Sequence, residues 1–222
     1  MRNRVSLLRL GLLGGLLVHA PLLALASPPA PATESEIRQL VADAREKSTE
    51  DFNGADHVVL LDEADVYVQP SGLATTEQCQ VIKLLTPAAV RAQCVQRFDF
   101  DPATRRVTVK ALRIHRADGT IQEVPLDDIV TQPTVQRWIF WGGEQHLLTV
   151  PRLRVGDAIE LRVSKIGFNI AYLDGAGPTA GGETLQPPMP GHWYEVTLFQ
   201  ARHPIVRKRY SVHMPEDMPV QY

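Results

Sequence analysis

The sequence predicts an all-β protein, an antiparallel β-sandwich of about ten short strands with one short N-terminal helix. From His57 onward, short segments rich in β-branched residues alternate between apolar and polar positions, which is typical of half-buried strands. Turn-forming sequences such as Asp118-Gly119 separate these segments at short intervals. Beyond His57, no segment has the length and periodicity of the crossover helices that a parallel sheet requires.

The first 26 residues have the pattern of a cleavable secretory signal peptide. Three arginines and no acidic residue precede an apolar run that ends at Ala24-Leu25-Ala26. The alternative is a transmembrane anchor, but the unbroken apolar stretch is shorter than the roughly 20 residues that span a bilayer. We therefore expect removal of residues 1–26, a periplasmic or secreted location, and no stable membrane insertion after signal cleavage.

Residues 27–50 are predicted to be a Pro/Ala linker followed by a short amphipathic helix. Thr33 and Glu36 have the spacing of a capping box, in which each side chain accepts a hydrogen bond from the other's backbone. Apolar residues then follow at helical spacing up to Ala44. The helix is expected to run from Thr33 to about Lys47 and to serve either as a lid on the domain or as a spacer.

Residues 51–222 are predicted to form the β-sandwich, an accessory domain. Its expected strands are residues 58–68, 74–85, 91–100, 107–115, 121–124, 147–153, 158–163, 193–200 and 205–214, of which 158–163 is the clearest. Residues 167–192 are rich in Gly and Pro, which indicates a long exposed loop.

The two cysteines, Cys79 and Cys94, are predicted to form a disulfide. If residues 79–94 fold as a hairpin with its loop at 85–88, the two side chains lie opposite each other across the strands. An oxidising compartment favours such pairing. The alternative is two separated thiols on different sheets.

Composition excludes several functions and leaves no candidate catalytic site. The formal net charge is −2 and there is no Lys/Arg block, so nucleic-acid binding is not expected. No two histidines or cysteines have the spacing of metal ligands, so neither a metal nor a cofactor is expected. The acidic pairs Asp62-Glu63 and Asp127-Asp128 point to opposite faces of a strand, and we interpret them as solvated.

The segment around Arg137, Trp138, Phe140 and Trp141 is the strongest candidate for a binding surface. In a strand, Trp138 and Phe140 share one face while Trp141 lies on the other. Aromatic side chains of this kind pack in a core, dock a second domain, or line a ligand site. The sequence leaves these three interpretations open.

The segment Leu153–Glu160 resembles the L-x-V-G-D-x-I-E signature of a bacterial family of unknown function, with Val155, Gly156 and Asp157 as its turn. Members of this family precede transglutaminase-like, papain-fold domains in exported proteins. Four other segments are similar to family segments in the same order, namely residues 55–63, 80–85, 113–120 and 204–215.

The resemblance implies a β-sandwich accessory domain without catalytic residues of its own, followed by a transglutaminase-like domain beyond residue 222. Such a domain would need a Cys activated by a His and oriented by an Asp. Our leading hypothesis is therefore an exported, non-catalytic module that positions or supports a transglutaminase-like domain in cis. The alternatives are the substrate-binding part of a cysteine hydrolase or acyl transferase, and a stand-alone carbohydrate- or peptide-binding sandwich.

Overall fold

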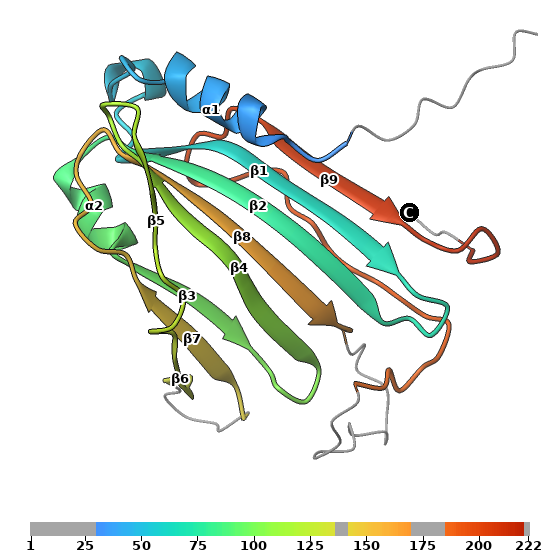
Figure 1. Cartoon of the computed structure of the whole chain (residues 1–222). Helices are drawn as coiled ribbons and strands as arrows, with labels where there is room; N and C mark the ends of the chain where they lie inside the picture. The colour runs from blue at the N-terminus through green and yellow to red at the C-terminus, as the bar shows by residue number, and fades with distance from the viewer. Residues whose placement is uncertain (1–29, 136–141, 170–184, 220–222) are drawn as a thin grey trace, which may run out of the picture.

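The computed structural model of the chain describes residues 30–135, 142–169 and 185–219, and within them it confirms a sandwich-like all-β fold. The described residues contain nine strands in two sheets. Figure 1 shows how the two sheets are arranged. The larger sheet contains, in spatial order, β5 (Ile121–Glu123), β4 (Arg105–His115), β8 (Ala158–Gly167), β2 (Ala74–Leu84), β1 (His57–Val68) and β9 (Lys208–His213). The smaller sheet contains β3 (Val95–Phe100), β7 (Glu144–Thr149) and β6 (Val130–Pro133).

The main core lies between the two sheets. Ile82, Leu112 and Ile159 point from one face of the larger sheet, which we call the sandwich face, and cluster with Leu148 near the end of β7. All four side chains are nearly or fully buried, and burial of apolar surface on this scale is the dominant favourable term in folding. The alternation predicted for these strands arises because only one of their two faces meets the other sheet.

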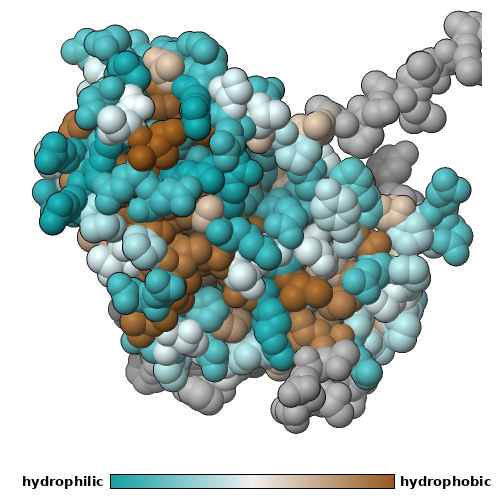
Figure 2. Space-filling view, viewed as in Figure 1, coloured by the Kyte–Doolittle hydropathy of each residue, from teal (hydrophilic) through white to brown (hydrophobic). Residues whose placement is uncertain are grey.

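The opposite face of the larger sheet, which we call the helix face, is partly covered by helix α1 (Glu34–Asp43). Ile37 of α1 is fully buried against Leu61 and Val81 of β1 and β2. The helix is therefore a lid on the domain, as one of the two sequence interpretations held. Figure 2 shows the molecule from the same side as Figure 1. Hydrophilic residues cover the outer surface of α1, and hydrophobic areas lie below the helix.

The predicted capping box is present at the start of α1. The Thr33 hydroxyl accepts a hydrogen bond from the Glu36 amide at 3.3 Å, and the Glu36 carboxylate accepts one from the Thr33 amide at 2.8 Å. Thr33→Ala is expected to lower the free energy of unfolding by about 1 kcal/mol, while Thr33→Ser leaves it nearly unchanged. Urea unfolding measures both variants, and equal stabilities of the alanine and serine variants would contradict the role of this cap.

The segment after β2 differs from the prediction. Residues 87–93 form helix α2 (Pro87–Gln93), and a strand begins only at Val95. The Thr86 hydroxyl caps this helix by accepting a hydrogen bond from the Ala89 amide at 3.2 Å, and Pro87 stands at the first helical position, where its missing N–H costs nothing. The expected hairpin is therefore wrong, because β3 continues into the smaller sheet instead of pairing with β2.

Two further differences concern the end of the chain. The segment 193–200, expected as a strand, belongs to neither sheet. Strand β9 lies parallel to β1, whereas the other pairings among the described strands are antiparallel. A short 3-10 helix, Glu50–Phe52, joins α1 to β1. Among the helices described, none is long and apolar enough to cross a membrane.

Candidate functional site

The signature turn Val155–Gly156–Asp157 precedes β8 and fastens it to the end of β2. The Gly156 amide donates to the Leu84 carbonyl at 2.8 Å, and the Leu84 amide donates to the Asp157 carbonyl at 2.9 Å. Gly156 has a φ of +93°, a conformation that side-chain-bearing residues rarely adopt.

Asp157 completes this turn with its buried carboxylate, which is 2% exposed. It accepts a hydrogen bond from the Arg154 amide at 2.9 Å and another from Arg116 Nη1 at 2.7 Å. Arg116 lies in the β4–β5 turn, so one carboxylate joins the start of β8 to that hairpin. The signature residues therefore act as a structural clamp among three parts of the larger sheet.

The predicted disulfide is absent, because both cysteines are free thiols. Cys79 lies in β2 on the helix face, opposite Arg162 of β8. Cys94 follows α2, is exposed, and donates from its thiol to the Arg91 carbonyl at 3.0 Å. The helix between the two cysteines removes the hairpin that would have placed them opposite each other.

The two thiols are expected to react very differently with iodoacetamide at pH 8. Burial raises the pKa of Cys79 from 9.0 to about 11. Its thiolate is then about 100-fold scarcer than that of an ordinary cysteine, and the side chain is also shielded. Peptide mass mapping should show that Cys94 is alkylated first. Cys79 should reach the alkylation rate of Cys94 only after denaturation. Resistance of both thiols until a reductant is added would contradict free thiols and restore the disulfide.

A cluster of charged side chains occupies the helix face beside α1. The Glu160 carboxylate, 2% exposed, lies 2.8 Å from His115 Nε2, 2.8 Å from Arg162 Nε and 3.5 Å from Arg113 Nη1. Burial opposes ionisation of Glu160, but hydrogen bonds from His115 and Arg162 outweigh it and lower its pKa to about 2. Arg113 also contacts Glu34 of α1 at 2.9 Å, so the cluster joins the helix to the sheet.

A second charged group lies where β1 meets β9. Glu63 and Asp65 are almost fully buried, and Arg209 of β9 reaches both, with its closest contact to Asp65 at 2.9 Å. Arg207 adds a contact to Glu63 at 3.1 Å, and the Ala32 amide donates to Glu63 at 2.9 Å. The interpretation of Glu63 as solvated is therefore wrong, because the N-terminal segment and β9 cover it.

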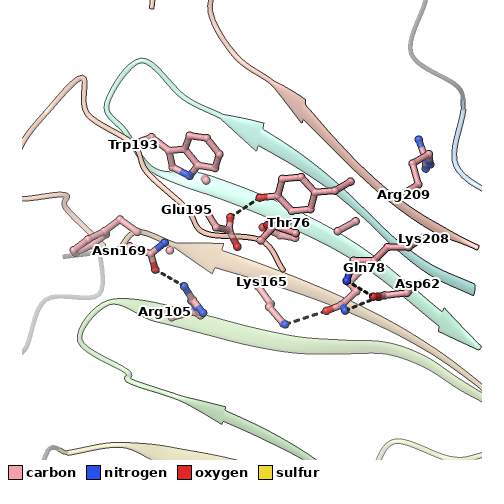
Figure 3. A pocket seen from close by; sticks show the side chains of 16 residues that line it. Asp62, Thr76, Gln78, Arg105, Lys165, Asn169, Trp193, Glu195, Lys208 and Arg209 are labelled. Atoms are coloured by element: carbon pink, nitrogen blue, oxygen red, sulfur yellow. Dashed lines mark hydrogen bonds and ion pairs between the residues drawn. The ribbon is translucent and has the colours of Figure 1, made fainter. Parts of the chain in front are cut away.

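A cavity of about 190 Å³ lies on the sandwich face, away from the main core (Figure 3). Strands β1, β2, β8 and β9 provide its floor, and the segment 193–197 provides one wall. Its polar side chains include Asp62, Gln78, Arg105, Lys165, Glu195 and Lys208, and Trp193 and Tyr210 contribute aromatic rings. No sequence pattern predicts this cavity, because its residues come together only through the order of the strands in the sheet.

The segment 193–200 is exposed except at Trp193 and Thr197, which are half-buried. Trp193, Glu195 and Thr197 line the cavity. Val196 and Leu198 point outward, with 78% and 73% of their surfaces exposed, and Phe199 is 63% exposed. Three large apolar side chains this exposed on neighbouring positions are typical of a surface that another protein or domain covers.

The predicted surface at Arg137, Trp138, Phe140 and Trp141 lies outside the described residues. Within the described ranges, no three His, Cys, Asp or Glu side chains are grouped as they would be to hold a metal ion.

A family model described as a domain of unknown function with solved structure, DUF3857, matches residues 70–222. The chain belongs to this family. The match begins just after β1 and includes the signature turn, both charged clusters in part, and the whole segment 193–200. Among curated proteins, the comparison found no match.

Several solved structures are similar to part of this chain. A Parabacteroides distasonis protein provisionally described as a protease has 15% identity and a TM-score of 0.46, over 54% of this chain and 24% of its own. An M1 zinc metallopeptidase from Deinococcus radiodurans has 19% identity and a TM-score of 0.27, over 51% of this chain and 21% of its own. This chain therefore spans about a quarter or less of the length of these proteins, and no functional argument rests on the likeness.

Proposed function

We propose that this chain is an exported, non-catalytic β-sandwich module that positions a transglutaminase-like domain located in the same polypeptide. The observation that carries the proposal is the outward-facing apolar group Val196, Leu198 and Phe199. If no other domain packed on this side, these side chains would stay in contact with water. A neighbouring domain would bury them, and each Å² of apolar surface removed from water would stabilise the contact by about 25 cal/mol. The signal-peptide pattern of residues 1–26 supports export.

The chemistry of the described side chains supports a non-catalytic role. A thiol nucleophile needs a neighbouring base and a lowered pKa. Burial instead raises the pKa of Cys79 to about 11. Its cross-strand partners are Arg162 of β8 and Glu63 of β1, and the Glu63 carboxylate is already engaged by arginine side chains of the C-terminal segment. The buried carboxylates Glu63, Asp65 and Glu160 are each held by arginine side chains and serve the fold.

The first experiment is the intact mass of the protein purified from its native host. The proposal predicts an N-terminus at Ser27 and a mass well above that of residues 27–222. The additional sequence should contain Cys, His and Asp in papain-like order. A mass equal to that of residues 27–222 would overturn the proposal and leave a stand-alone module.

The docking surface is tested in the same full-length protein. Val196→Glu with Leu198→Glu should increase protease cleavage between the module and the following domain, because two charges would be buried at the interface. Val135→Glu is the matched control, since Val135 is 85% exposed and lies outside the segment. Equal cleavage of the two variants would argue against docking at this surface.

The cavity favours a second candidate, in which the module contributes a binding wall for a peptide or another small ligand of its parent protein. A cavity of about 190 Å³ is smaller than the sites of roughly 300–1,000 Å³ that hold whole drug-sized ligands. It would therefore accept one end group or side chain of a ligand. Loss of peptide-amide hydrolysis or transfer by the parent when the cavity is filled by a larger side chain would distinguish this role from pure support.

A further inference from the structure

The cavity on the sandwich face contains both positive and negative side chains, and they differ in how they are partnered. Asp62 accepts from Lys208 Nζ at 2.8 Å, and Glu195 accepts from the Tyr210 hydroxyl at 2.8 Å. Both carboxylates of the cavity are therefore already engaged. Lys208 is likewise neutralised by its ion pair with Asp62.

Arg209 also lines the cavity and is paired with Glu63 and Asp65. The remaining two cations, Lys165 and Arg105, have only neutral hydrogen-bond partners among the described residues. Lys165 Nζ donates to the Gln78 side-chain carbonyl at 3.0 Å, and Arg105 Nη2 donates to that of Asn169 at 2.8 Å. Neither forms an ion pair within the part of the chain that the structure describes. Figure 3 shows Lys165 and Arg105 as neighbours on the cavity floor, each reaching toward its amide partner.

The strand register explains why these two cations lie close together. Arg105 of β4 is opposite Gly167 of β8, and Lys165 is two residues away on the same face. Any side chain at position 167 would overlap the Thr104 carbonyl, because a Cβ there would lie 2.5 Å from that oxygen. Gly167 therefore lets the start of β4 approach β8 closely, which brings Arg105 to the same end of the sheet as Lys165.

The electrostatics of Lys165 and Arg105 favour an anion beside them. Burial lowers the pKa of Lys165 and the positive charge of Arg105 lowers it further, and the charges of Glu195 and Asp62 only partly offset these two effects. A buried cation is stabilised when an anion takes up its unused donors, and an anion placed between two cations gains charge-assisted hydrogen bonds from both.

We propose that Lys165 and Arg105 form a binding site for a carboxylate at the end of a peptide or of a small organic acid. A single negative charge suits the cavity, because Asp62 and Glu195 line the same space and would repel a phosphate dianion. Trp193 and Phe168 line the cavity as well and provide apolar surface for the carbon atoms next to the carboxylate. This proposal holds whether or not the module docks on a transglutaminase-like domain.

The test is an NMR titration of the mature protein with N-acetylglycine, which carries a free carboxylate, and with N-acetylglycinamide, which has nearly the same shape and no charge. N-acetylglycine should shift the signals of residues around the cavity in a saturable way, and the amide should not. Acetate is titrated in parallel to distinguish a peptide terminus from a small organic acid as the source of the carboxylate. If acetate binds more weakly than N-acetylglycine, the site recognises a peptide terminus. If the two bind equally, it recognises a small acid. Equal binding of the acid and the amide, or tighter binding of phosphate than of either acid, would overturn the proposal.

Variants assign the site to these two residues. Lys165→Gln and Arg105→Gln should each weaken N-acetylglycine binding about tenfold, a loss of one charge-assisted contact. Lys110→Gln is the matched control, because Lys110 is an exposed lysine of β4. Lys165→Arg keeps the charge and should keep binding, which separates loss of the site from loss of folding. Unchanged affinity in folded Lys165→Gln or Arg105→Gln would reject the assignment.

Discussion

Replacing Glu160 with glutamine is expected to lower the free energy of unfolding by about 3 kcal/mol at pH 7, the cost of removing one member of a buried ion cluster. The carboxylate is 2% exposed and is shared by His115, Arg162 and Arg113. Glutamine has nearly the same shape but no charge, so these three side chains would lose their common counterion. Urea unfolding of both proteins measures the difference.

The matched control is Glu77→Gln. Glu77 lies on the same face in the neighbouring strand and accepts from the Ser164 hydroxyl at 2.7 Å, but it is exposed and has no arginine partner among the described residues. This change should alter stability by less than about 0.5 kcal/mol. Similar losses in the two variants would show that Glu160 contributes no more than a surface carboxylate.

The pH dependence should identify the same group. The pKa of Glu160 lies at about 2 in the folded protein, below its ordinary value of 4.5. Its ionised form is therefore favoured by folding, and this stabilisation is complete above pH 4.5 and is lost as the pH falls toward 2. The stability difference between the native protein and Glu160→Gln should shrink between pH 5 and pH 2. A difference that stays constant over this range would exclude the carboxylate charge as its source.

The sequence was sufficient to predict the elements whose signals are local. The helix after Thr33 and the long strands of the larger sheet were predicted correctly, because caps and two-residue alternation depend on neighbouring residues. The short helix α2 was missed although its signal is also local: the pair Thr86-Pro87 was read as a turn, whereas it caps and starts a helix.

The features that create the candidate sites depend on residues far apart in the chain. Glu63 and Arg209 are separated by 146 positions and meet only because β9 lies parallel to β1. In a period-two pattern Glu63 and Glu160 are polar positions, which predicts exposure. Their burial requires α1 and the N-terminal segment to lie over the helix face, and no strand pattern encodes that cover. The cavity with Lys165 and Arg105 likewise follows from strand order, which alternation does not specify.

Asp157→Ala is expected to lower the free energy of unfolding by about 3 kcal/mol, because it removes two hydrogen bonds made to one buried carboxylate. The Arg154 amide and the Arg116 guanidinium would lose their acceptor, and the turn that joins β8 to β2 and to the β4–β5 hairpin would loosen. Asp118→Ala is the matched control, since Asp118 is an exposed aspartate of that hairpin whose carboxylate accepts from the Thr120 amide at 2.9 Å.

Comparing Asp157→Ala with Asp118→Ala shows whether the signature turn stabilises this chain or instead makes contacts outside it. If the turn is a clamp, Asp157→Ala should lose stability in urea unfolding while Asp118→Ala changes little, and hydrogen exchange should quicken at the Leu84 and Gly156 amides, which bond across the turn. If Asp157→Ala instead has the stability and the hydrogen-exchange rates of the wild-type protein, the Asp157 carboxylate does not stabilise the turn. Its role would then lie in contacts with another chain or domain. In that case Arg116 and Asp157 together would mark a second surface to test against the proposed transglutaminase-like domain.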